Sequence, residues 1–172
     1  MCSGTDIERT KMRRIAVSLA LVVTLLTGCA SSPEVTAGDL WIKSSEMSVE
    51  GGMTAVYGVI VNNTANDIVL VGGSTTVAGV VEVHEMAMID GAMKMQKIDG
   101  GLVVPAGGSV VLEPGGNHLM LMQLTEEITA GEEVSVTFDF DGAADLTVDG
   151  IVAKPAEGGD EEYHSGEMEM TD

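Results

Sequence analysis

Short apolar segments, separated by glycine and asparagine turns, dominate the pattern of the chain between about residues 38 and 154. The segments are rich in Val, Ile and Thr, and paired turn residues such as Gly51-Gly52, Asn62-Asn63 and Gly72-Gly73 divide them. No segment keeps a helical period over ten or more residues. We expect strands near 39–43, 53–62, 66–73, 79–86, 93–97, 109–113, 118–124, 133–140 and 145–152. This pattern predicts one all-β domain, folded as a sandwich or a barrel.

The two ends of the chain differ from this body. Residues 1–28 combine a basic start, a short apolar run and the sequence Leu26-Thr27-Gly28-Cys29, which resembles the export signal and lipidation site of bacterial lipoproteins. Cleavage before Cys29 would leave a lipid-anchored, extracytoplasmic protein, with residues 29–37 as a tether and 38–154 as the folded domain. Residues 155–172 are acidic and rich in glycine, so we expect a disordered tail.

Histidine and methionine are concentrated between His84 and Met122. Two of the three histidines and six of the 12 methionines lie there. His118 and Met120 are separated by a single leucine, and on a strand such alternation places both side chains on one face. Thioether sulfur is a soft ligand and imidazole binds copper well, so a site of Met and His favours copper(I) over zinc, calcium or magnesium.

The spacing of these residues resembles the copper-binding signature of the periplasmic copper chaperones of the PCu(A)C family. That signature is a His, about ten residues, a Met, about twenty-one residues, and His-x-Met. Here ten residues separate His84 from Met95, and 22 separate Met95 from His118, which begins His118-Leu119-Met120. The additional residue is expected in the turn at 99–101, where an insertion costs little.

The resemblance covers roughly residues 37–154 and implies a Greek-key, cupredoxin-like β-sandwich. It implies copper(I) ligands at His84, Met95, His118 and Met120. It also implies delivery of copper to the dinuclear centre of cytochrome c oxidase, either directly to subunit II or through a thiol-bearing chaperone.

Several other methionine and histidine residues have more than one possible role. We interpret Met86, Met88, Met93 and Met122 as packing or supporting residues, with Met93 an alternative to Met95 as ligand because of the additional residue. The tail carries His164, Met168 and Met170, which form either a second copper site, as in some relatives of the PCu(A)C type, or a merely solvated end.

Composition excludes several other functions. The chain has 27 acidic and eight basic residues, which is unsuited to binding nucleic acid. No Cys follows Cys29, so a blue-copper electron-transfer site, which needs a thiolate, is excluded. No nucleophile–base pair or phosphate loop can be identified, and we expect no enzyme. The alternatives are a lipid-anchored structural or adhesion sandwich with methionines in its core, and a copper storage or resistance protein.

Overall fold

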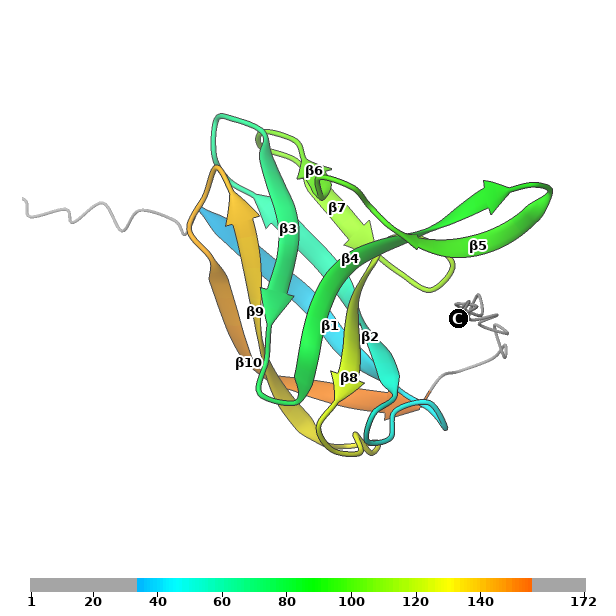
Figure 1. Cartoon of the computed structure of the whole chain (residues 1–172). Coiled ribbons are helices and arrows are strands. Elements are labelled where there is room, and N and C mark those ends of the chain that lie inside the picture. Colours follow the sequence, from blue (N-terminus) through cyan, green and yellow to red (C-terminus); the bar gives the residue numbers. More distant parts are fainter. Residues whose placement is uncertain (1–33, 156–172) are drawn as a thin grey trace, which may run out of the picture. The chain divides into compact units, whose positions relative to one another are not determined.

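The computed structural model describes residues 34–155, and within this range every regular element is a strand (Figure 1). The ten strands are β1 (Val35–Ser44), β2 (Met53–Asn62), β3 (Ile68–Ser74), β4 (Ala78–Ile89), β5 (Ala92–Lys97), β6 (Leu102–Val104), β7 (Ser109–Leu112), β8 (His118–Leu124), β9 (Glu133–Asp141) and β10 (Leu146–Pro155). The expected all-β class is confirmed. No helix among these residues is long and apolar enough to cross a membrane.

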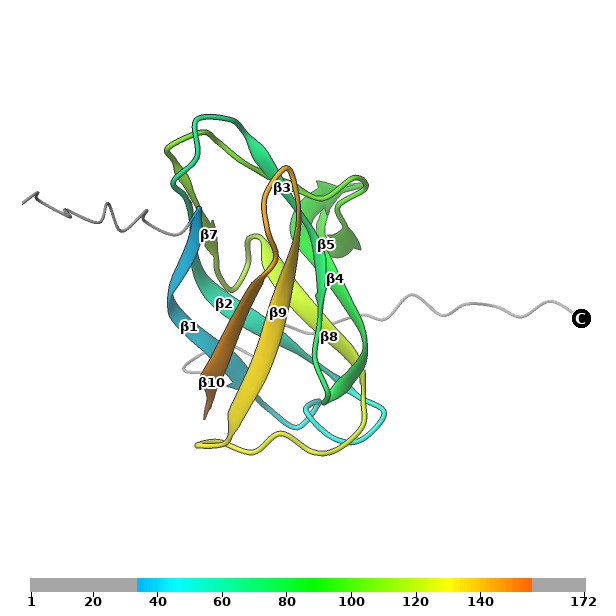
Figure 2. The same cartoon turned by 90° about the vertical axis from the view of Figure 1, so that its left-hand side faces the viewer.

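The strands form two facing layers. The first has the order β5-β4-β8-β2-β1, with β7 also paired to β2, and the second has the order β10-β9-β3-β6. Strand β10 joins the layers, because its first part pairs antiparallel with β9 and its last residues pair parallel with β1. Figure 2, turned by 90° from Figure 1, shows β9 and β10 in front of β2 and β8. The result is the cupredoxin-like β-sandwich that the resemblance implied.

The core lies between the layers and consists of residues from alternate positions of the strands. In β9, Phe138 and Phe140 are buried while Asp141 is exposed, as the alternating pattern of this segment predicts. Leu119 and Leu121 of β8 are fully buried in this core and pack with aliphatic residues of both layers. Met120, which lies between them, must therefore point to the outer face of the first layer, as must His118 and Met122.

That outer face carries a second, smaller apolar cluster. Its buried members are Ala55, Tyr57 and Met120, and four partly buried residues pack against them, namely Trp41, Met53, Met95 and Met122. The sandwich thus has one core between its layers and one aromatic and methionine cluster on the outer side of β1, β2 and β8.

The strands differ from the sequence-based expectation in several places. Strand β10 continues to Pro155, the first residue of the expected disordered tail, because Pro155 pairs with Ser44 of β1. Strand β1 begins at Val35, inside the expected tether, because residues 35–38 pair with the end of β2. Strand β6 was not predicted, since three residues are too few to show an alternating pattern, but it pairs with β3 through Leu70. Strands β4 and β5 continue to Ile89 and from Ala92, and their hairpin extends beyond the body of the sandwich (Figure 1).

Candidate metal centre

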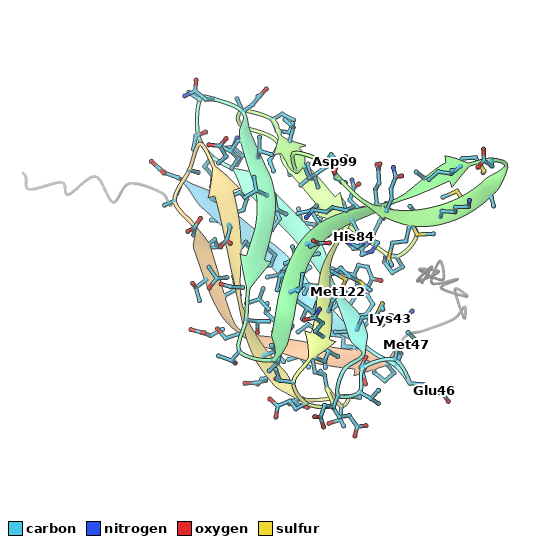
Figure 3. All side chains as sticks on the ribbon, in the orientation of Figure 1. Lys43, Glu46, Met47, His84, Asp99 and Met122 are labelled. Carbon is cyan, nitrogen blue, oxygen red and sulfur yellow. The ribbon has the colours of Figure 1, made fainter. Side chains whose placement is uncertain are left out.

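His84 and His118 lie side by side on the outer face of the first layer. They are direct partners in the antiparallel pairing of β4 with β8, and their ring centroids are 5.9 Å apart. Both are buried, with 7% and 3% of their surface exposed. Figure 3 shows His84 at the base of the β4–β5 hairpin, with Met122 further along the sheet. Two histidines distant in sequence are therefore brought together by strand register.

The period of two along β8 places Met120 and Met122 on the same face as His118. Met120 is opposite Glu82 on one side and Ala55 on the other, and Met122 is opposite Met53. The leucines between them belong to the inter-layer core. The predicted placement of His118 and Met120 on one face of a strand is therefore confirmed.

Met95 comes from the hairpin strand β5 and meets His118 directly. Its Sδ atom is 3.2 Å from Nε2 of His118. Met93 lies two residues further out, opposite Met88, and half of its surface is exposed. The structure thus brings His84, Met95 and His118 together and leaves Met93 further along the hairpin.

Each histidine has one ring nitrogen held by an oxygen acceptor. Nδ1 of His118 lies 3.1 Å from the carbonyl oxygen of Gly116, which can only accept a hydrogen bond. In the neutral ring, Nδ1–H donates to Gly116, and Nε2, the atom facing Met95, carries the lone pair. In this tautomer the Nε2 lone pair can bind a metal ion, and a backbone carbonyl commonly fixes a ligand histidine in this way.

In His84 the other ring nitrogen, Nε2, is the one that bonds an oxygen acceptor, and this acceptor is a carboxylate. Its Nε2 atom is 3.1 Å from Oε2 of Glu82, so in the neutral ring this nitrogen donates and Nδ1 carries the lone pair. Among residues 34–155, Nδ1 of His84 is the one buried side-chain nitrogen or oxygen atom without a hydrogen-bond partner. A buried polar atom without a partner is costly, and a metal ion would supply the missing interaction.

Glu82 is in turn held by Lys97 of β5, whose Nζ donates to Oε1 at 2.7 Å. The hydrogen bonds from Lys97 and from His84 hold the pKa of Glu82 below its usual range. The carboxylate therefore stays ionised at neutral pH, accepts from both neighbours, and orients the His84 ring.

The centre is enclosed on the side of β2, and it is not a shallow, exposed site. Met120 has only 2% of its surface exposed, because it packs against Ala55 and Tyr57 of β2. Trp41 extends this wall, with its ring 4.7 Å from that of Tyr57. Met120 is thus a packed residue as well as a candidate ligand, while Met95 and Met122 remain partly exposed.

Sequence reasoning did not identify Glu82 and Tyr57 as parts of this centre. Glu82 precedes His84 by two residues, and the same period of two that grouped the methionines would have placed its carboxylate on this face. Tyr57 lies 6.2 Å from the His118 ring, centroid to centroid, but only the register between β2 and β8 reveals this proximity.

The remaining sequence-based expectations lie outside the described residues. They concern the lipidation site Cys29 and the tail residues His164, Met168 and Met170. Within the described part of the chain, no three side chains of the His, Cys, Asp or Glu type gather as a metal-binding group. The candidate centre therefore depends on its thioethers.

Solved structures confirm the fold. A copper-bound PCuAC domain from PmoF2 matches with a TM-score of 0.55 and 20% identity, over 71% of this chain and 94% of that domain. Apo-DR1885 from Deinococcus radiodurans matches with a TM-score of 0.51 and 29% identity, over 73% of this chain and 82% of that protein. The resemblance to PCu(A)C proteins is thus present in the three-dimensional fold.

Sequence comparisons identify the family. The family model described as "Putative lipoprotein LpqE-like" matches residues 35–152, nearly the whole described domain. The "Putative lipoprotein Lxx21020" of Leifsonia xyli subsp. xyli is 32% identical over 164 residues, which cover 90% of this chain and 98% of that protein. With a family model across the sandwich and a relative of nearly equal length, this chain belongs to the LpqE-like lipoprotein family.

Proposed function

We propose that this protein binds copper(I) outside the cytoplasm and transfers it to an acceptor protein. The observation that carries the proposal is the meeting of His118 Nε2 with Met95 Sδ at 3.2 Å, with the ring of His84 5.9 Å from that of His118, centroid to centroid. Two imidazoles and thioethers, without a thiolate or a carboxylate ligand, form a donor set suited to a soft monovalent ion. The copper-bound PCuAC domain of the same fold supports this reading.

The proposed ligands are His84, Met95, His118 and Met120. Met95 is preferred to Met93 because its sulfur contacts His118, whereas Met93 faces solvent on the hairpin. Neutral thioethers bind without releasing protons, and the partly exposed Met95 is the ligand that an incoming donor could replace first. Copper would remain copper(I) throughout, and transfer would be a series of ligand exchanges.

The proposed acceptor is the dinuclear copper centre of cytochrome c oxidase, reached directly in subunit II or through a thiol-bearing chaperone. Membrane attachment through a lipidated Cys29 would keep the protein beside a membrane-bound acceptor, and the lipoprotein relatives support this location. Binding and transfer involve no bond-making in a substrate, so the proposed activity is not enzymatic.

Transfer can be measured directly. The copper(I)-loaded protein, mixed with the apo soluble domain of subunit II under anaerobic conditions, is expected to lose its copper and generate the absorption of the dinuclear centre after oxidation. Retention of copper when either subunit II or a reduced dithiol chaperone is offered would contradict delivery and favour storage. If the protein binds no copper at all, the alternative of a structural or adhesion role takes the place of the copper function.

The carboxylate of Glu82 offers a test of how His84 is oriented. Glu82→Gln keeps an oxygen acceptor for His84 but loses the ion pair with Lys97, and we expect copper(I) affinity to fall by about tenfold. The matched control is Glu85→Gln on the same strand, since Glu85 bonds Gln96 on the other face of the hairpin. Competition titration with a chromophoric chelator measures both. Equal affinities of the two variants would show that Glu82 does not support the centre.

A further inference from the structure

The β4–β5 hairpin carries two methionine pairs, one above the other. Met86 is opposite Met95, and Met88 is opposite Met93. Alternate residues of paired strands share a face, so all four side chains lie on one side of the hairpin. The inner pair adjoins His118 through Met95, and the outer pair lies near the hairpin turn at Asp90 and Gly91.

Packing does not account for the outer pair. Met88 has 66% of its surface exposed and Met93 has 50%, whereas the sequence-based interpretation of these residues as packing would require burial. The hairpin extends beyond the sandwich (Figure 1), and neither residue belongs to an apolar cluster of the described domain. Two large apolar side chains are thus placed side by side in solvent.

Their geometry is suited to a soft ion. Directly opposite residues of antiparallel strands have Cβ atoms about 4.5–5.5 Å apart, and two methionine side chains can therefore bring both sulfurs to one ion. Lys94, which follows Met93 in the sequence, has its ammonium 4.0 Å from the Asp90 carboxylate, and it lies on the opposite face because it pairs with Ala87. The Asp90 carboxylate adds negative charge at the turn.

We propose that Met88 and Met93 form an outer copper(I)-binding pair, which takes up the ion before it moves along Met86 and Met95 to the histidines. This proposal rests on the proposed function of the inner centre. Exposure decreases from the outer pair, through the partly buried Met86 and Met95, to the 3% of His118. Each step along the strand spans about 7 Å, which flexible thioether side chains can bridge by successive ligand exchange.

The outer pair can be observed by NMR of methyl-labelled methionine during titration with silver(I), a soft monovalent ion that is stable in air. The protein is residues 30–172, which contain the whole described domain. Single Met→Leu variants assign the signals. We expect Met95 and Met120 to shift during the first equivalent, and Met88 and Met93 to shift together with further silver. Met47, which is 43% exposed, is the comparison signal. Because Met47 lines one small cavity with Met53 and Met120, the comparison is made after the first equivalent, when the inner centre is full.

Three results would overturn the outer pair. These are Met88 and Met93 signals that stay unshifted in excess silver, that shift no more than the Met47 signal, or that shift independently of one another. Failure of the inner centre would be seen in different signals, because the Met95 and Met120 signals would then stay unshifted.

A kinetic measurement completes the test. The double variant Met88→Leu and Met93→Leu is expected to slow copper(I) uptake several-fold and to leave the equilibrium copper(I) affinity of the inner centre within twofold of the original. Unchanged uptake would contradict the proposed route.

Discussion

Replacing His118 with alanine is expected to lower copper(I) affinity by more than about 100-fold. Loss of residues that merely support a metal ligand typically lowers affinity 10–100-fold, and loss of the ligand itself should exceed this. His118 also joins the three elements of the centre, since it is opposite His84, contacts Met95 and shares a face with Met120. Anaerobic competition titration measures the change.

The control for this variant is His164→Ala, which removes the remaining histidine of the chain from its tail. If copper binds at the inner centre, His164→Ala should leave the tightest affinity nearly unchanged. Urea unfolding of both variants shows whether the fold is retained, because His118 is buried. A folded His118→Ala protein that binds copper(I) as tightly as the original would contradict its assignment as a ligand.

Replacing Met120 with alanine is expected to destabilise the domain by about 2–5 kcal/mol, the usual cost of truncating a buried Met. Met120 has 2% of its surface exposed and packs against Ala55 and Tyr57. Met120→Leu conserves volume and should cost less than about 1.5 kcal/mol. Urea unfolding of the two variants measures this difference.

The same two variants separate packing from ligation at Met120. Leucine fills the space but has no sulfur, so Met120→Leu should lower copper(I) affinity while the fold is kept. The comparison variant is Leu121→Met on the core side of β8, which adds a thioether away from the centre. Undiminished copper affinity in Met120→Leu would show that Met120 only packs, and the metal would then be held without it.

The strands that position the centre were predictable because their sequences alternate. In β8, leucines at 119 and 121 face the inter-layer core and residues 118 and 120 face outward, a separation that follows from the pleat of a strand. Strand β9 is similar, with its two phenylalanines buried. Strand β6 was not predicted, because a strand of three residues is too short to show alternation of apolar and polar positions.

The candidate centre was only partly predictable, because register is a tertiary property. Sequence spacing grouped His84 with Met95 and His118, but it could not tell Met95 from Met93. The contact of Met95 with His118 depends on how the hairpin is placed on β8. The enclosure of Met120 likewise depends on Tyr57, a residue of β2 whose neighbours cannot be inferred from its own strand.

The exposure of the outer methionines differed from expectation for a related reason. Alternation predicts which residues share a face, and it does not reveal whether another element covers that face. Met86 and Met88 have the same period along β4, yet Met86 is partly buried near the sandwich while Met88 is exposed on the extended hairpin. Their different surroundings follow from the length of the hairpin.

The most direct test is an anaerobic copper(I) titration of residues 30–172, combined with X-ray absorption at the copper edge. One tightly bound copper with mixed sulfur and nitrogen coordination, retained when the chain ends at Pro155, is the expected result. It would place the ion at the histidines and methionines of the sandwich. Absence of tight binding, or coordination that disappears with the tail, would contradict a metal centre at His84, Met95, His118 and Met120.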